Sequence, residues 1–215
     1  MTMQEFITGF IGASPLEIIA SVAGFICVFL IIRRSMWCWF FGFIQVSLFA
    51  YIFFGAKLYS DAGLHVVYMG LQFYGWWNWM QHTNSHNKQM PELLVHPSSS
   101  KDLALWSGVA ITGTFILGYL MHTYTDASFA YADAFTTCTS LVAQWLLTRR
   151  HLFNWVFWIV VNVVAIFIYM QKGLYPTSVL YFTFLIMCFF GQYSWWQQYR
   201  RQQASGQNIE HEIVR

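Results

Sequence analysis

The stretch Gln72-Phe73-Tyr74-Gly75-Trp76-Trp77-Asn78-Trp79 closes a long apolar run and concentrates aromatic rings and two amides within eight residues. A similar stretch, Gln192-Tyr193-Ser194-Trp195-Trp196-Gln197, closes another apolar run near the C-terminus. Amides both donate and accept hydrogen bonds, and aromatic faces pack against flat ligands. Two such clusters at matching places in two halves of a chain predict one ligand site that is built from both halves.

The composition indicates a membrane protein. Of 215 residues, 57% are hydrophobic and only 9% are charged, whereas a soluble domain carries about 25% charged residues. The chain has too little polar surface for water, and its 11 tryptophans are typical of the aromatic belts at membrane interfaces. The net charge of +2 and the lack of a basic patch argue against a nucleic-acid partner. The lipid bilayer is the expected solvent, and the four cysteines are interpreted as small apolar residues.

Seven segments are long and apolar enough to be membrane-spanning helices, each of which needs about 20 residues. The first begins at Ser14-Pro15, where Ser14 can cap the helix, Pro15 suits its first turn and Glu17 completes a capping box. The fold class is therefore all-α integral membrane. The predicted spans cover residues 14–32, 36–54, 60–80, 103–124, 127–148, 152–170 and 175–199.

The chain also repeats itself. Residues 33–41 match residues 149–157 at an offset of 116, while the two aromatic clusters match at an offset of 119. The second offset implies about three inserted residues in the last span and aligns Trp79 with Gln198. One helix between two three-helix units makes the repeats parallel, in a 3+1+3 arrangement. The expected parts are an interfacial segment (1–13), a first repeat (14–82), a cytoplasmic loop (83–101), a linker helix (102–125), a second repeat (126–199) and a cytoplasmic tail (200–215).

Basic residues predict the orientation in the membrane. Seven spans place nine Lys and Arg residues on one face and only Lys57 and Lys172 on the other. The basic face of a membrane protein is cytoplasmic, so we expect a periplasmic N-terminus and a cytoplasmic C-terminus. The nine residues are Arg33, Arg34, Lys88, Lys101, Arg149, Arg150, Arg200, Arg201 and Arg215.

Polar side chains inside apolar spans are costly and usually face a bundle interior or a binding site. Gln72, Asn162 and Gln192 stand out because they lie near aromatic residues in spans that would face each other. Each amide could instead serve only as a hydrogen bond between helices, and each aromatic only as packing. The candidate substrate-binding residues are Gln45, Gln72, Asn162, Gln192, Phe41, Tyr51, Tyr74 and Trp158.

The chain lacks the motifs of common catalytic sites, since it contains no GxSxG, Walker A or HExxH sequence. We therefore expect no catalytic residue, no cofactor and no metal. One alternative remains, a membrane enzyme or scaffold that uses His82 and His86, whose i, i+4 spacing allows two metal ligands on one helix face. Metal analysis of the purified protein would separate this alternative from a transporter.

The 3+1+3 arrangement resembles that of the SWEET sugar transporters. The motif Gln72-x-Tyr74-Gly75-Trp76-x-x-Trp79, its echo at residues 192–196 and the segment Trp37-Cys38-Trp39-Phe40-Phe41-Gly42 look more like the PnuC family of bacterial vitamin transporters. The resemblance covers about residues 14 to 199. It implies an inner-membrane, multi-pass protein that carries nicotinamide riboside, thiamine, riboflavin or a deoxynucleoside down a gradient, and it allows homo-oligomers.

This resemblance implies that cytoplasmic phosphorylation traps the vitamin after uptake. Nicotinamide riboside has a flat cationic ring, a carboxamide and ribose hydroxyls, which match aromatic faces and amides. We expect facilitated diffusion of nicotinamide riboside by alternating access, with the solute bound between the repeats. Thiamine or a sugar on the same fold is the alternative, because thiamine is also flat and cationic.

Overall fold

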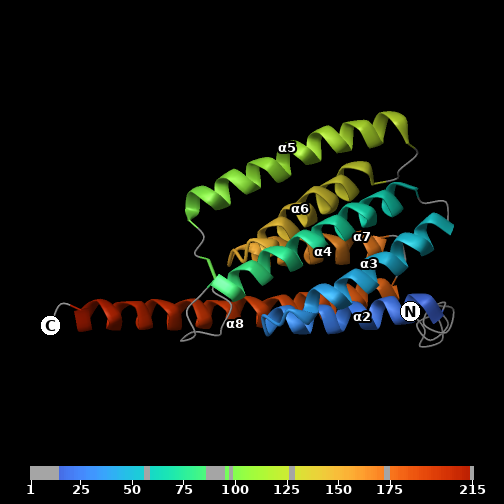
Figure 1. Ribbon diagram of the computed structural model, residues 1–215. Helices are drawn as coiled ribbons and strands as arrows, with labels where there is room; N and C mark the ends of the chain where they lie inside the picture. Colours follow the sequence, from blue (N-terminus) through green and yellow to red (C-terminus); the bar gives the residue numbers. More distant parts are fainter. Residues whose placement is uncertain are drawn as a thin grey trace.

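The computed structural model describes residues 15–55, 59–85, 95–96, 99–125, 129–171 and 175–213. These residues form an all-helical protein with seven helices, one for each predicted span (Figure 1). The interfacial segment expected at 1–13 and the N-cap expected at Ser14 lie outside the described residues. The helices are α2 (Pro15–Ile32), α3 (Trp37–Gly55), α4 (Tyr59–Ser85), α5 (Ser100–Tyr124), α6 (Ala130–Thr148), α7 (Asn154–Gln171) and α8 (Tyr175–Ile213).

Six of the helices form a closed ring. Contacts run from α2 to α3, to α4, to α6, to α7, to α8 and back to α2, while α5 packs on the outside against α6 (Figure 1). Among the described residues no helix pair contacts across the ring. Two contacts, α4–α6 and α2–α8, join helices that are distant in sequence, and we name them the two seams. The ring therefore has an inner side that is reached from all six helices.

Hydropathy distinguishes the helices that are apolar enough to face lipid from the two that must pack against protein. Five are apolar and long enough to cross a membrane, namely α2, α3, α5, α7 and the part of α8 at Ser178–Ala204. The two more polar helices, α4 and α6, pack against each other in one seam. Polar side chains within a bilayer are turned towards protein because lipid cannot hydrogen-bond them. The α4–α6 seam satisfies that requirement.

The two termini of the described chain lie at opposite ends of the bundle (Figure 1). Helices α2, α4, α6 and α8 run in one direction and α3, α5 and α7 run in the other (Figure 1). We name the end at which α2, α4, α6 and α8 begin the amino end, and the opposite end the carboxyl end. The predicted basic residues Arg33, Arg34, Arg149 and Arg150 follow the last turns of α2 and α6, at the carboxyl end.

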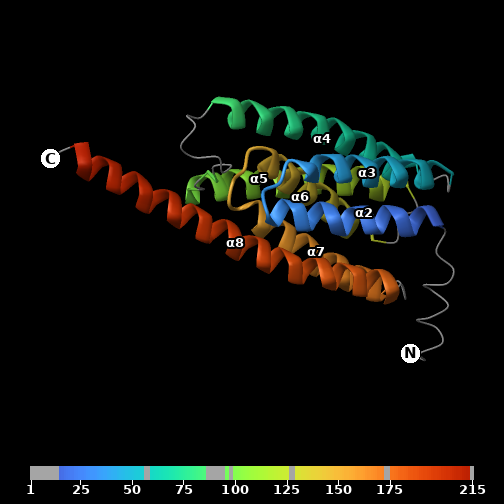
Figure 2. The same ribbon diagram turned by 60° about the horizontal axis from the view of Figure 1, so that its bottom comes forward.

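Two predicted boundaries differ from the structure. The last helix does not end at Tyr199 but continues through the residues expected as a tail, to Ile213, and extends past the bundle (Figure 2). Gln, Arg and Ala, which favour helix, dominate the start of this extension. The predicted loop at 83–101 is also shorter, because α4 continues to Ser85 and α5 begins at Ser100, after a capping box between Ser99 and Asp102.

The loops after α2 and α6 have the same conformation. Arg34 and Arg150, 116 residues apart, both adopt a left-handed backbone, with φ of 56° and 58°. In each loop the next residue donates its N–H to a carbonyl five residues earlier, Ser35 to Leu30 at 2.9 Å and His151 to Leu146 at 3.0 Å. This is the Schellman ending of a helix, which satisfies carbonyls that a helix end leaves free.

Candidate functional site

Four buried indoles meet where the two halves of the ring meet. Trp39 of α3 packs edge-on against Trp79 of α4, with ring centroids 5.1 Å apart, and Trp155 of α7 packs edge-on against Trp195 of α8 at 5.6 Å. Trp79 and Trp195 then contact each other at 6.4 Å. All four side chains are at most 2% exposed. They form an aromatic layer, the tryptophan layer, that links both seams near the carboxyl end.

Glycines create the room for these rings. A Cβ at Gly75 would lie 2.1 Å from the Trp39 ring, and a Cβ at Gly191 would lie 2.4 Å from the Trp155 ring. No side chain fits at such distances, so each indole lies directly against the backbone of the next helix. The glycine in the opening motif is therefore required by Trp39.

The tryptophan layer corrects the predicted alignment of the repeats. Trp39 and Trp155, Gly75 and Gly191, and Trp79 and Trp195 are all related by an offset of 116. Trp79 therefore corresponds to Trp195 and not to Gln198, and no three-residue insertion is needed. The sequence suggested 119 because neighbouring tryptophans at 76, 77, 195 and 196 match in a shifted register.

Side chains from α4 and α8 close the two seams by capping helix ends. The Trp79 indole donates to the Leu147 carbonyl at 3.4 Å, and the Trp195 indole donates to the Ile31 carbonyl at 3.0 Å. One residue earlier, Asn78 donates to the Thr148 carbonyl at 2.7 Å. In the other seam Ser194 donates to the Ile32 carbonyl at 3.3 Å. These acceptors are last-turn carbonyls, and those of Ile31 and Leu147 also accept from the loop N–H groups of Arg34 and Arg150, both at 2.9 Å.

The predicted amides of the first half lie against glycines on neighbouring helices. Gln72 is 8% exposed, and its amide would be 2.5 Å from a Cβ at Gly42 of α3. Gln45 packs in the same way over Gly24 of α2, where the corresponding distance is 2.7 Å. Both amides are thus held close to helix backbone. Only glycine at positions 24 and 42 leaves room for these amides, so any larger residue there would displace Gln45 or Gln72.

The predicted residues of the second half gather beside the tryptophan layer. Asn162 is 4% exposed and donates to the Trp158 carbonyl at 2.7 Å and to the Cys188 sulfur at 3.5 Å. Phe41 and Trp158 pack against the core cluster that contains all four indoles and Cys188. One turn beyond Cys188, the buried Oε1 of Gln192 has no hydrogen-bond partner. A buried acceptor without a partner is costly and is available to a ligand or water.

Two predicted residues lie apart from this group. Tyr74 stacks on Trp145 of α6, with ring planes 4° apart and centroids at 5.4 Å, and the Arg149 guanidinium lies 5.8 Å from its ring. Tyr51 is 70% exposed near the end of α3. Their role in binding stays a prediction.

Sequence reasoning missed several polar groups on the ring. The indole N–H groups of Trp39 and Trp155 are buried without partners, and they occupy equivalent positions. Tyr68 of α4 hydrogen-bonds Ser140 of α6 across a seam. The spacing of Tyr68 to Gln72, one helical turn, was the available signal. It was hidden because tyrosine and serine are common in membrane helices as packing and interfacial residues.

The carboxyl end carries buried positive charge. Arg150 is 2% exposed, and burial lowers the pKa of its guanidinium below the usual value. The His96 ring contacts this guanidinium at 3.2 Å, and the backbone of His96 pairs with Arg150 and Leu152 at 3.0 and 3.3 Å. The short segment at 95–96 is thus hydrogen-bonded to the loop between α6 and α7.

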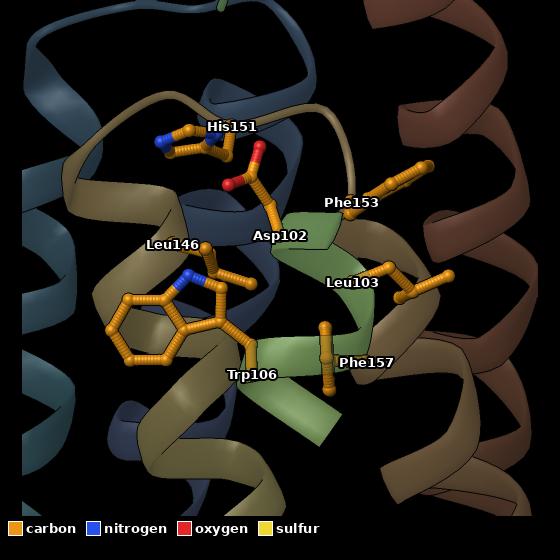
Figure 3. Close-up of a pocket in the computed structure, with 7 residues that line it drawn as sticks. All are labelled: Asp102, Leu103, Trp106, Leu146, His151, Phe153 and Phe157. Carbon is orange, nitrogen blue, oxygen red and sulfur yellow. The ribbon is translucent and has the colours of Figure 1, made fainter. Parts of the chain in front are cut away.

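One shallow pocket lies outside the ring, between the start of α5 and the α6–α7 loop (Figure 3). Its empty volume is about 160 Å³. None of the eight predicted site residues lines it. The lining residues are Asp102, Leu103, Trp106, Leu146, His151, Phe153 and Phe157.

The metal alternative gains no structural support. Within the part of the chain that the structure describes, no group of three or more His, Cys, Asp or Glu residues could hold a metal ion. His86 lies outside that part, and the side chain of His82 is not described.

The comparisons with known proteins point to one family. The family model described as "Nicotinamide mononucleotide transporter" matches residues 14–197. The nicotinamide riboside transporter PnuC of Escherichia coli K12 is 26% identical over 203 residues, which cover 85% of each chain. PnuC of Neisseria mucosa is 27% identical, covering 87% of this chain and 74% of the relative. The riboflavin/roseoflavin transporter RibM of Streptomyces davaonensis is 24% identical, covering 86% of each.

A solved structure agrees with the fold. The crystal structure of the vitamin B3 transporter PnuC matches with a TM-score of 0.72 and 26% identity, over 93% of this chain and 88% of that one. The family members are transporters and not enzymes. The apolar helices and these matches make the protein a multi-pass protein of the bacterial inner membrane. By its sequence over residues 14–197 and by its fold, the chain belongs to the PnuC family of membrane transporters.

Proposed function

We propose that this protein transports nicotinamide riboside. Three relatives or solved structures that resemble it over most of its length are named for vitamin B3 or nicotinamide riboside transport. The observation that carries the proposal is a group of three amides, on the buried Gln72 and Asn162 and on the half-buried Gln192, whose Oε1 is itself buried. Gln72, Asn162 and Gln192 offer donors and acceptors without charge, and Gln192 has an acceptor without a partner.

In this proposal the amides and the aromatic rings contact different parts of the ligand. Gln72, Gln192 and Asn162 hydrogen-bond the carboxamide or ribose, while Trp158 and Phe41 stack on the cationic ring. Gln45, Tyr74 and Tyr51 remain predicted contacts. Tyr74 would have to leave its stack on Trp145 to reach a ligand.

The proposed architecture is two parallel three-helix repeats, α2–α4 and α6–α8, joined by α5. Contacts that recur at an offset of 116 support it, including the two loop conformations and the two indole caps. Rocking of one repeat against the other around a central site gives alternating access. The amino end would face the periplasm, because the basic loops lie at the carboxyl end.

Transport would run down a gradient, since none of the Asp and Glu side chains that the structure describes is buried, as a carboxylate pair for proton coupling would be. Phosphorylation of the vitamin in the cytoplasm would then trap it. Homo-oligomers remain a prediction.

A binding measurement tests the site. We expect Gln72→Ala and Asn162→Ala each to weaken nicotinamide riboside binding by about tenfold in detergent, as a lost buried hydrogen bond costs about 1.4 kcal/mol. Gly42→Ala should weaken it too, because its new Cβ displaces the Gln72 amide. Gly70→Ala on α4, where a Cβ meets nothing within 4 Å, is the matched control. Unchanged affinity in both amide variants would disprove this assignment.

Riboflavin is the second candidate, because the match to RibM covers 86% of this chain, against 85% for PnuC of E. coli. A thermal-shift screen against nicotinamide riboside, thiamine, riboflavin and sugars separates the candidates. The largest stabilisation should come from nicotinamide riboside, since at equal ligand concentration the stabilisation grows with the logarithm of the affinity.

A further inference from the structure

A hydrogen-bonded chain of hydroxyl groups crosses the α4–α6 seam on the amino side of Gln72. The Ser140 hydroxyl donates to the Thr137 carbonyl at 2.9 Å, within its own helix. Its single proton is therefore in use, so the bond between Tyr68 and Ser140 has the tyrosine as donor. The Tyr68 oxygen keeps its lone pairs free to accept a further hydrogen bond. Donation in series along such a chain strengthens each bond.

The Tyr68 hydroxyl lies in the seam between α4 and α6, where it meets Ser140. Gln72, one turn further along α4, lies against Gly42 of α3. Tyr68 and Gln72 thus lie on the side of α4 that faces α3 and α6, its two neighbours in the ring. Tyr68 also packs edge-on against His65 of the same helix, with centroids 5.8 Å apart. Two hydroxyls and aromatic rings are therefore close together in this seam.

The corresponding level of the other seam is apolar among the described residues. The offset of 116 relates Tyr68 to Phe184 and Ser140 to Gly24, and the contact found there joins Phe25 and Phe184, with centroids 4.9 Å apart. At this level the α2–α8 seam is joined by aromatic rings, while its polar contacts lie nearer the carboxyl end, at Ser194 and Trp195. Two helices can pack in a seam at this level without hydroxyls. The hydroxyl pair in the α4–α6 seam therefore suggests a role besides helix packing.

The distance to the amide group matches a nucleoside. Tyr68 and Gln72 are four residues apart on one face of α4, which places them about 6 Å apart along the helix axis. A ring and its attached sugar span a similar length, so one ligand can reach both positions. Uncharged hydroxyls flanked by aromatic rings suit a sugar, which has both hydroxyls and apolar C–H faces.

We propose that Tyr68 and Ser140 form a sugar subsite one helical turn on the amino side of Gln72. This rests on the proposed function and deepens it, since it assigns the ribose to the hydroxyls and leaves the carboxamide to the amides. A ribose hydroxyl donates to the Tyr68 oxygen, which in turn donates to Ser140. The ligand then lies along α4, with its flat ring towards the tryptophan layer.

A comparison of ligands tests this subsite. The probes are nicotinamide riboside and its 2′-deoxy and 3′-deoxy analogues, titrated against the purified full-length protein in detergent. We expect the parent to bind nicotinamide riboside about tenfold more tightly than at least one analogue. Tyr68→Phe should lose about tenfold in affinity for nicotinamide riboside and bind that analogue as the parent does, because the analogue already lacks the hydrogen bond. Ser140→Ala should act in the same direction with a smaller loss.

Thr114→Val is the control for loss of a buried hydroxyl, because Thr114 bonds only its own helix, at the Ala110 carbonyl, on α5 outside the ring. It should leave both affinities unchanged. If Tyr68→Phe weakens all three ligands equally, or weakens none, the subsite is wrong while the proposed function stands. If the parent binds nicotinamide riboside but does not distinguish either analogue, the subsite is also wrong. A parent that binds no nicotinamide riboside contradicts the proposed function itself.

Discussion

The two seams of the ring are alike at the carboxyl end and different midway along the helices. At the carboxyl end, both use an indole and its preceding residue to cap a helix of the other half, Trp79 on α6 and Trp195 on α2. Midway along the helices, the α4–α6 seam is joined by Tyr68 and Ser140, whereas the α2–α8 seam is joined by Phe25 and Phe184. The same backbone relation therefore carries different chemistry.

This difference has a physical meaning in a transporter of an asymmetric solute. The carboxyl-end caps join the last turn of a helix in one half to a side chain of the other half, in both seams. The side chains midway along the helices cap no helix end, so they can differ between the seams. A solute with a flat ring at one end and hydroxyls at the other contacts two unlike walls, which a perfectly symmetric ring could not offer.

The largest effect should come from the tryptophan layer, where the seams are alike. Trp79→Ala and Trp195→Ala each remove a side chain that is 0% exposed, at a cost of about 3 kcal/mol. The unfolding midpoint in detergent should fall by roughly 6–12 °C for both variants. Trp37→Ala, at a side chain that is 63% exposed, is the control and should change little. A large loss in only one of the two buried variants would break the equivalence of the seams.

A smaller effect should distinguish the residues next to these indoles. Asn78 reaches its carbonyl at 2.7 Å and Ser194 reaches its carbonyl at 3.3 Å. Asn78→Ala should cost about 1 kcal/mol and Ser194→Ala about 0.5 kcal/mol, as hydrogen bonds between membrane helices are individually modest. Thermal unfolding of both variants in the same detergent measures the difference. A larger loss for Ser194→Ala would show that distance does not rank these caps.

The smallest effect concerns the arginines that follow α2 and α6. The Arg149 guanidinium lies 4.9 Å from the Trp145 ring centroid and also near Tyr74, whereas Arg33 lies 4.7 Å from Phe29 alone. Exposed cation–π contacts contribute about 0.5–1 kcal/mol, and most for tryptophan. Arg149→Gln should therefore lower the unfolding midpoint by roughly 1–4 °C, and Arg33→Gln by less. Equal shifts would mean that the Tyr74–Trp145 stack adds nothing to this contact.

Hydropathy allowed the helices to be predicted well, while their alignment was predicted less well. Each predicted span has a helix, because about 20 apolar residues in lipid leave the backbone no alternative. The repeat register between 72–79 and 192–197 was wrong by three residues, since clustered tryptophans match in more than one register. Only the contact of Trp39 with Gly75, and of Trp155 with Gly191, distinguishes the registers.

The candidate site shows the same division. Gln72, Asn162 and Gln192 were identifiable because an amide in an apolar span is rare and costly. Tyr68 and Ser140 were not, because tyrosine and serine have several ordinary roles in membrane helices. Their pairing appears only when α4 and α6 pack together.

The sequence by itself determined that this is a helical membrane protein with duplicated aromatic and amide clusters, because composition and hydrophobic length are local properties. The tertiary structure decided which helices close the ring, which register relates the halves, and that one seam is polar where the other is apolar. These features depend on contacts between residues up to 164 positions apart, as between Trp195 and Ile31. Such contacts follow from side-chain shape and hydrogen bonding across the seams, which a linear pattern does not contain.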